Sequence, residues 1–245
     1  MPLAMVLLAL DVIFVVHAAK TGRLWPWAYV ILMIPGFGVL AYILVELVPE
    51  WMGTAQGQRA RQKVIKTLDP EKRYRALADQ LETTDTIANR VALAEECLAL
   101  GKYDEAKEHF AAVLVRPMGE EPVYALGKAR AEFGLGCVTD TVATLDALRA
   151  QWPDYQSADG HLLYARALEA SGRSEEALEE YQALANYYPG AEARVRYGLL
   201  LDKMGRRFEA EAVFTETLKQ LKRAPKYVRQ AQAEWIALAQ KALRG

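Results

Sequence analysis

The chain has 245 residues, a length that suits one or two domains. Its 30 Lys and Arg nearly balance its 31 Asp and Glu, so the net charge of −1 gives no reason to expect nucleic acid as an electrostatic partner. The charges are unevenly placed, because residues 1–49 hold only Asp11, Lys20, Arg23 and Glu46, whereas the chain beyond residue 59 is rich in charge and alanine. This asymmetry predicts a membrane segment followed by a soluble helical segment.

Residues 2–19 form the first apolar run, with Asp11 as its one charge. A helix of this length is about 27 Å long, enough to cross the hydrocarbon core of a bilayer, so we expect a first membrane span here. A cleaved signal peptide is the alternative, because "VHAA" resembles a cleavage site, but no Lys or Arg precedes the run. Asp11 is either a functional acid or a carboxyl that locks the two helices together against backbone freed by Pro35, and we favour the locking role.

Residues 24–48 form the second apolar run, after the short polar turn "KTGR". Pro35 and Gly38 lie inside the run, where a neighbouring helix that approaches closely can compensate for the break. Aromatic residues cluster near both ends of the run, as they do at the two faces of a membrane: Trp25, Trp27, Tyr29, Tyr42 and Trp51. We therefore expect a kinked second span, and a transmembrane hairpin over residues 1–50 with both chain ends on one side.

The stretch "RLWPWAYVILMIPGFGVLAYILVEL" resembles the N-terminal membrane hairpin of phospholipase D-type cardiolipin synthases. The resemblance covers about residues 5–50 and rests on six matching positions, Ile34, Pro35, Gly38, Ala41, Tyr42 and Glu46. It implies that Asp11, Pro35, Gly38 and Tyr42 belong to a membrane hairpin. The catalytic H-x-K-x4-D motif of that family is absent, since none of His17, His109 and His161 has Lys two positions later.

Residues 51–82 are expected to form a basic linker with a short helix from Asp69 to about Leu81, begun by Asp69 and Pro70. The basic stretch is either attracted to anionic lipid or an ordinary solvated linker, and the second is favoured. Its cations, Arg59, Arg61, Lys63 and Lys66, outnumber those of the turn. By the positive-inside rule, we expect a cytoplasmic C-terminal domain, and the resemblance implies a multi-pass protein of the bacterial inner membrane with the same orientation.

A repeat follows the linker. Four turn glycines, Gly101, Gly136, Gly172 and Gly205, are spaced by 35, 36 and 33 residues. A small residue stands five positions after each glycine: Ala106, Thr141, Ala177 and Ala210. A large one stands nine positions after it: Phe110, Leu145, Tyr181 and Phe214. Glycine ends the first helix of a pair, the small residue lets two helices touch, and the large residue fills the groove to the next pair.

This pattern resembles the tetratricopeptide repeat over about residues 83–222, although the second repeat is degenerate at Val138 and Thr141. The resemblance implies an α-solenoid of about four helix pairs over residues 83–245. We expect the amphipathic helix 226–243 to cap it through Tyr227, Ala231, Trp235 and Leu238. The predicted fold class is therefore all-α: a two-helix transmembrane hairpin followed by a tetratricopeptide-type solenoid.

A solenoid of this type has a concave face lined by the first helix of each pair. Arg130 and Arg166, 36 residues apart, are candidates to clamp a carboxylate or a peptide C-terminus. Their alternative, which we favour, is a structural network with Glu95, Glu132 or Glu169. The apolar candidates for the same face are Leu126, Phe133 and Leu162, together with Val91 and Leu199.

No nucleophile–base set, phosphate-binding loop or metal cluster is recognisable, so we predict no enzyme activity, no cofactor and no metal. Cys97 and Cys137 are expected to be free thiols rather than a disulfide or a metal site. The predicted function is a membrane-anchored scaffold for protein–protein interaction. Its partners are a protein or peptide on the concave face and the lipid bilayer through the hairpin, without nucleic acid; the oligomeric state stays open. The alternative is an accessory or regulatory protein of cardiolipin-type phospholipid metabolism.

Overall fold

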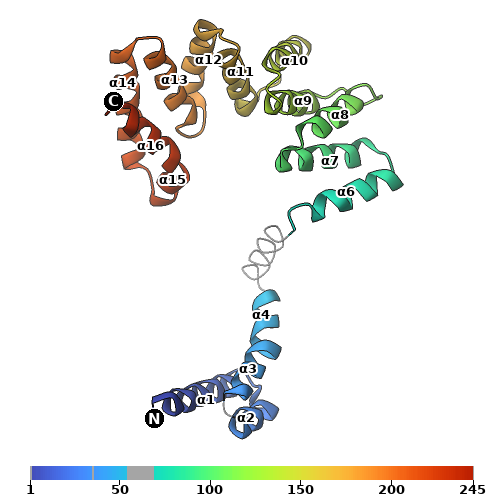
Figure 1. Cartoon of the computed structure of the whole chain (residues 1–245), viewed down its shortest axis with the longest axis vertical. Helices are drawn as coiled ribbons and strands as arrows, with labels where there is room; N and C mark the ends of the chain where they lie inside the picture. Colours follow the sequence, from blue (N-terminus) through green and yellow to red (C-terminus); the bar gives the residue numbers. More distant parts are fainter. Residues whose placement is uncertain (1, 35, 54–68, 245) are drawn as a thin grey trace. The chain divides into compact units, whose positions relative to one another are not determined.

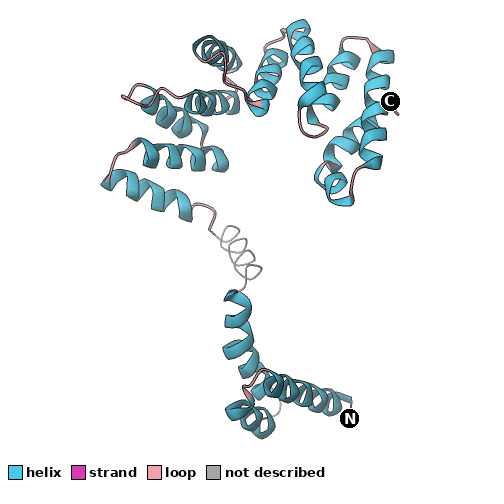
Figure 2. Ribbon diagram, turned by 180° about the vertical axis from the view of Figure 1, so that it is seen from behind, coloured by secondary structure: helices cyan, strands magenta, loops and turns pink. Residues whose placement is uncertain are grey.

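The computed structural model describes residues 2–34, 36–53 and 69–244, with side chains from residue 8 to 50 in the first part. The chain divides into two compact units, Met1–Lys72 and Arg73–Gly245, each considered by itself below. Every regular element in the described ranges is a helix (Figure 1, Figure 2). The predicted all-α class is confirmed for these residues.

The first unit begins with a helix–turn–helix. Its helices are α1 (Pro2–Lys20), α2 (Leu24–Met33), α3 (Phe37–Tyr42), the π-helix η1 (Ile43–Leu47) and α4 (Val48–Gly53). Helix α1 packs against α2 and α3. The small core between them consists of Ala18, Ile31, Val39 and Tyr42.

The single second span predicted over 24–48 is wrong. Helix α2 ends at Met33, Gly36 has a positive φ of 80°, and a new helix starts at Phe37. Helix α2 has 10 residues, and the helical segment after the break, Phe37–Gly53, has 17. At a rise of about 1.5 Å per residue, α2 is roughly half as long as the hydrocarbon core of a bilayer is thick.

The predicted location in the inner membrane is therefore corrected. Among the described residues, no helix is both long enough and apolar enough to cross a membrane. The sequence argument failed because it counted the apolar residues of 24–48 as one helix across a break. The cytoplasmic orientation rested on Arg59, Arg61, Lys63 and Lys66, which lie outside the described residues, as does Pro35.

The second unit is a stack of helix pairs. Helix α6 (Lys72–Thr83) comes first, where the sequence predicts a helix over 69–81. The four pairs are α7 (Ile87–Leu100) with α8 (Tyr103–Leu114), α9 (Pro122–Gly134) with α10 (Val138–Gln151), α11 (Ala158–Ala170) with α12 (Ser174–Tyr187), and α13 (Glu192–Lys203) with α14 (Arg207–Arg223). Each pair packs internally and against the next, which gives the stacked arrangement expected of the repeats.

The repeat positions have the roles that their spacing predicts. The four turn glycines all have positive φ, from 75° to 83°, which ends the first helix of each pair. Ala106, Ala177 and Ala210 are fully buried. Thr141, which replaces alanine in the second repeat, is also buried, and its hydroxyl donates to the Cys137 carbonyl at 2.9 Å. The degenerate repeat therefore keeps its fold because the extra polar group finds a partner.

The two ends of the stack are covered differently. Helix α6 packs Tyr74, Leu77 and Leu81 against the first pair. At the other end, the single capping helix predicted over 226–243 is instead two helices, α15 (Lys226–Ala231) and α16 (Ala233–Ala242). At the break, the side-chain oxygen of Gln232 accepts a hydrogen bond from the Ala191 N–H at 2.9 Å.

Two of the four residues predicted to lie on the apolar face of the capping helix contact the stack. Trp235 and Leu238 pack against the core of the stack, whereas Tyr227 and Ala231 are exposed. Arg196 of α13 stacks on the Trp235 ring, with its guanidinium carbon 5.1 Å from the ring centroid. Most of the seal at this end therefore comes from α16, which packs against both α13 and α14, while α15 touches α14 only.

Candidate functional site

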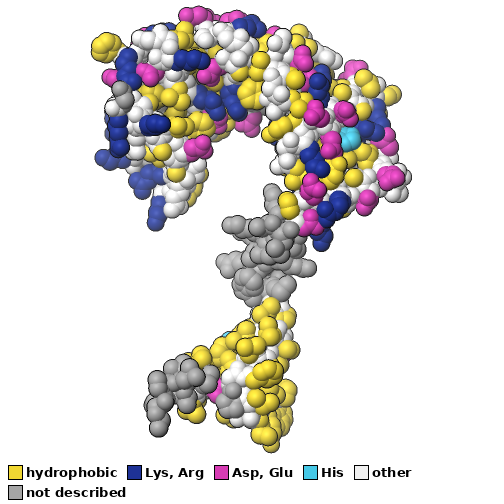
Figure 3. Space-filling view, in the orientation of Figure 1, with side chains coloured by type: hydrophobic (Ala, Val, Ile, Leu, Met, Phe, Trp, Pro, Cys, Tyr) yellow, Lys and Arg dark blue, Asp and Glu magenta, His cyan; other side chains and the backbone are white. Residues whose placement is uncertain are grey.

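The candidate residues of the concave face lie on α9 and α11, the first helices of the second and third pairs. Figure 1 shows the stack as an arch with α9 on its inner side and α10 on its outer side. Figure 3 shows Lys and Arg side chains among apolar ones on the inner side of this arch. The side chains of α9 and α11 on this inner side therefore determine what the face can bind.

Arg130 of α9 is held by a carboxylate of the preceding pair. Its guanidinium lies 3.2 Å from Glu95 on α7, and both side chains are about half exposed. This contact is the structural network that the sequence offers as the alternative to a clamp. Exposed ion pairs of this kind add little stability, so a ligand carboxylate can compete with Glu95.

Arg166 of α11 is placed differently. Its guanidinium carbon lies 4.8 Å from the centroid of the Phe133 ring on α9. Within the part of the chain that the structure describes, Arg166 has no ion-pair partner. The two arginines are thus not a matched pair, because one is neutralised by Glu95 and the other is supported by an aromatic ring.

The apolar candidates differ in how far they are exposed to a ligand. Leu162 is 5% exposed and belongs to the core, so it is not offered to a ligand. Phe133 is half-buried beneath Arg166. Leu126 is half-buried and lines a cavity between the second and third pairs.

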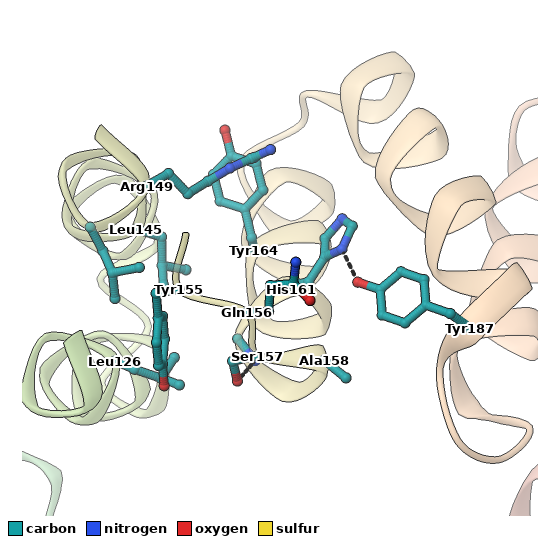
Figure 4. Close-up of a pocket in the computed structure, with 12 residues that line it drawn as sticks. Leu126, Leu145, Arg149, Tyr155, Gln156, Ser157, Ala158, His161, Tyr164 and Tyr187 are labelled. Atoms are coloured by element: carbon teal, nitrogen blue, oxygen red, sulfur yellow. Dashed lines mark hydrogen bonds between the residues drawn. The ribbon is translucent and has the colours of Figure 1, made fainter. Parts of the chain in front are cut away.

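This cavity, called the seam pocket here, has a volume of about 680 Å³ and lies where the second and third pairs meet. Figure 4 shows its lining residues gathered from α9, α10, α11 and the end of α12. Aliphatic side chains and three tyrosines form most of the wall, and the lining consists of Leu126, Leu145, Leu148, Arg149, Tyr155, Gln156, Ser157, Ala158, Gly160, His161, Tyr164 and Tyr187.

A chain of polar contacts forms one wall of the seam pocket. Arg149 donates to one oxygen of Glu180 at 3.0 Å. His161 contacts the other oxygen of Glu180 through Nε2 and the Tyr187 hydroxyl through Nδ1. The hydrogen bonds from His161 and Arg149 lower the pKa of Glu180, against the opposing effect of its burial. The carboxylate therefore stays charged and compensates the Arg149 guanidinium.

Tyr164 continues the same wall. The Arg149 guanidinium lies 4.8 Å from its ring centroid, and its hydroxyl donates to Asp146 at 2.7 Å. Burial, with the Asp146 hydrogen bond, raises the pKa of Tyr164 to about 12. Ser157 is also engaged, because its hydroxyl accepts from the Gly160 N–H at 3.0 Å and caps α11. Five polar side chains of the wall thus have partners within the protein: Arg149, Ser157, His161, Tyr164 and Tyr187. This arrangement is suited to binding rather than to nucleophilic catalysis.

Sequence reasoning missed Arg149, Tyr155, His161 and Tyr187, because they come from separate helices and a loop. The loop "WPDYQS" between Gln151 and Ala158 brings Tyr155 into the wall. No single repeat position marks these residues, because the pocket forms only where two pairs meet.

The residues assigned to the hairpin have structural contacts in the first unit. Asp11 is 4% exposed and accepts a hydrogen bond from the Gly36 N–H at 3.2 Å, next to the helix break. Tyr42 is buried, with its hydroxyl 3.0 Å from His17 Nδ1. A Cβ on Gly38 would lie 2.4 Å from the Val30 carbonyl oxygen, so α3 needs glycine to approach α2.

Both cysteines are free, as predicted. Burial raises the pKa of the Cys97 thiol to about 11, so this group stays protonated near neutral pH. The described residues contain no group of three side chains placed to hold a metal ion.

Comparison with known proteins shows what the stack is. Residues 159–191, which cover most of α11 and all of α12, match the tetratricopeptide repeat family. The stack has the tetratricopeptide repeat fold. A crystal structure of MamA has a TM-score of 0.54 and 20% identity, covering 61% of this chain and 86% of that one. A thermophilic tetratricopeptide repeat protein of Thermus thermophilus has a TM-score of 0.53 and 21% identity, covering 75% of this chain and 97% of that one.

These tetratricopeptide structures establish the fold alone, because their identities to the chain are low. Among curated proteins, none matches the sequence. The comparisons give no support to the resemblance of residues 5–50 to cardiolipin synthases. The prediction of tetratricopeptide-type repeats is confirmed, and proteins built from them are typically non-catalytic scaffolds for protein–protein interaction.

Proposed function

We propose that this protein is a scaffold that holds a protein partner on the inner face of α9 and α11. The tetratricopeptide fold supports this general role, because stacked helix pairs offer an extended concave surface. The finer assignment depends on what that surface presents to a partner. Arg166 on this surface has no ion pair among the described residues, so the partner segment is expected to carry an acidic side chain or a free carboxylate.

The observation that carries the proposal is the state of Arg166. Its guanidinium stacks on Phe133 and has no ion pair among the described residues. A stacked guanidinium is held in place by the ring while its N–H donors, which lie in the guanidinium plane, stay available to an acceptor. A planar fork held in this way suits a carboxylate, which it binds with two parallel hydrogen bonds.

Arg130 has a secondary role in this proposal. Arg130 is already paired with Glu95, so a ligand carboxylate that binds it must replace Glu95. This exchange of one partner for another adds little to the binding free energy. Replacing Arg130 is therefore expected to weaken partner binding less than replacing Arg166. A larger effect of Arg166→Ala than of Arg130→Ala would distinguish the proposed site from a nonspecific effect of positive charge on affinity.

Affinity capture with the full chain tests the proposal. The immobilised protein is compared with Arg166→Ala, Arg130→Ala and Arg206→Ala, the last being a control arginine paired with Glu209 near the start of α14. Loss of a hydrogen bond to a charged group costs about 1.5–3 kcal/mol, so the partner retained by the wild type should bind Arg166→Ala about tenfold or more weakly. Equal capture by Arg166→Ala and Arg206→Ala contradicts the proposal.

The link to phospholipid metabolism is not proposed. It depended on the resemblance of residues 5–50 to cardiolipin synthases, which the comparisons do not support. No observation on the described residues favours it over a role in protein binding.

A further inference from the structure

The seam pocket is separate from the proposed binding face. Its lining from α11 includes Gly160, His161 and Tyr164. With about 3.6 residues per helical turn, these positions project from the side of α11 roughly opposite to Arg166. A ligand in the pocket is therefore independent of a partner held by Arg166, and the pocket needs an occupant of its own.

The size and the apolar wall of the seam pocket favour an aromatic occupant. Its volume of about 680 Å³ is within the roughly 300–1,000 Å³ of pockets that hold small ligands. Figure 4 shows leucines of α9 and α10 on one side of the pocket and the rings of His161 and Tyr187 on the other. Burial of apolar surface drives binding to such a wall, and a flat ring gains further from stacking on other rings.

The charged groups around the seam pocket are already paired. Arg149 and His161 contact the two carboxylate oxygens of Glu180. Glu180 is half-buried, so a ligand carboxylate that took Arg149 from it would leave a poorly solvated charge with one partner fewer, which is costly. A cationic ligand would in turn lie beside Arg149. The occupant is therefore expected to be uncharged.

Two uncharged polar side chains of the pocket have no such partner. In the loop between α10 and α11, which the structure describes in full, the Tyr155 hydroxyl and the Gln156 amide make no hydrogen bond to the protein. Tyr155 is half-buried and Gln156 is exposed. A hydroxyl and an amide can both donate and accept, so they can bind a neutral polar group without disturbing an existing pair.

We propose that the seam pocket binds a neutral aromatic group with a hydrogen-bonding substituent such as an amide or a hydroxyl. The leucines and tyrosines bury the ring, and Tyr155 and Gln156 bind the substituent. This chemistry is shared by free compounds such as phenols and indole amides and by the Tyr and Trp side chains of a peptide. The proposal does not depend on the function assigned to Arg166.

A set of indoles of similar size tests the charge rule. Near neutral pH, indole-3-acetamide is uncharged, indole-3-acetate is an anion and tryptamine is a cation. Their binding to the full chain is detected by saturation-transfer NMR, and titrations give the dissociation constants. We expect the amide to bind at least about tenfold more tightly than either charged compound.

The same assay distinguishes the two sources of the aromatic group. A blocked pentapeptide of glycines with one central tryptophan presents the same ring on a peptide chain. Tighter binding of this peptide than of indole-3-acetamide supports a side chain of a protein partner as the occupant. The reverse order supports a free compound.

Three variants test the site itself. Ala158→Trp fills the pocket without removing any of its polar contacts, and should weaken binding of the amide about tenfold or more. Tyr155→Phe removes one hydroxyl, and should weaken the amide several-fold but leave 3-methylindole, which lacks the substituent, unchanged. Ala150→Trp, at an exposed position of α10 outside the pocket lining, is the matched control and should bind like the wild type. Ala158→Leu is a smaller change in case Ala158→Trp unfolds.

Several results would overturn the inference. No binding by any neutral compound, or equal binding of the neutral and charged indoles, contradicts the proposed chemistry. Binding that both Ala158 variants leave unchanged shows that the ring lies elsewhere. The variant Arg166→Ala should bind the indoles like the wild type, and a loss of binding there would contradict the separation of the two sites. None of these results decides whether Arg166 holds a protein partner, which affinity capture measures.

Discussion

Glu180 shows at the residue scale how one carboxylate organises a wall of the seam pocket. It accepts from His161 and from Arg149, and both contacts lower its pKa. Because the contacts join α10, α11 and α12, the charge of a single side chain ties three helices together. Removal of that charge should therefore change the free energy of unfolding of the stack.

Acidification tests the role of Glu180. A carboxylate whose pKa is lowered by folding stabilises the folded state fully above its unfolded pKa, near 4.5, and this contribution is lost as the pH falls through the folded pKa. The melting temperature of the wild type should thus fall more steeply below about pH 4.5 than that of Glu180→Gln. Glu179→Gln, an exposed neighbour on the same helix, is the control. Identical pH profiles for wild type and Glu180→Gln would rule out this role.

At the scale of elements, the stack is joined by contacts between an aromatic ring and a glycine. Phe110 of α8 is fully buried, and a Cβ on Gly127 of α9 would lie 2.4 Å from its ring. Within the last pair, Phe214 of α14 meets Gly198 of α13 in a similar way. The repeat pattern predicts the buried aromatic residues, whereas the close contact of each ring with its glycine becomes evident only from the packing.

The substitution Gly127→Ala tests this contact. Alanine normally stabilises a helix by about 1 kcal/mol relative to glycine, but here the added methyl group overlaps the ring of Phe110. We expect a net loss of about 1–3 kcal/mol in the free energy of unfolding, measured by urea denaturation. In a Phe110→Leu background, where the ring is gone, Gly127→Ala should cost less. An equal cost in both backgrounds would show that the clash is not the cause.

At the scale of the whole molecule, the two units differ in the surface they expose. Most of the large apolar side chains that the described residues leave exposed lie in the first unit, on α1, α2, α3 and the segments beside them, including Leu8, Trp25, Leu32 and Phe37. The repeat stack instead has a continuous apolar core through its last three pairs. The two units should therefore behave differently when they are separated.

Separation of the units gives the corresponding prediction. Residues 69–245 contain the core of the stack and the helices that cover both its ends, so this fragment should be helical and unfold at the temperature of the repeats in the full chain. An apolar dye such as anilinonaphthalene sulfonate should bind the full chain more strongly than the fragment. Circular dichroism and dye fluorescence measure the two effects. A fragment that is unfolded would show that the stack needs the first unit.

Much of the stack could be predicted because its determinants are local. The glycine at each turn, the small residue five positions on and the large residue nine positions on act within one helix pair or between neighbours. The first unit was predicted less well. Its two apolar runs were identified, but the second was treated as one helix, although α2 ends at Met33 and a new helix starts at Phe37 after Gly36, which has a positive φ.

The sequence by itself determined that the chain is helical, where the repeats turn, and which residues fill their core, because these properties depend on spacing along one chain segment. Only the tertiary structure decided that Arg130 is paired while Arg166 stacks on Phe133, and that α10, α11 and the "WPDYQS" loop enclose a pocket. Those features arise between helices distant in sequence, where small differences in packing select a partner for each side chain. The periodicity of the sequence does not show which partner each side chain contacts.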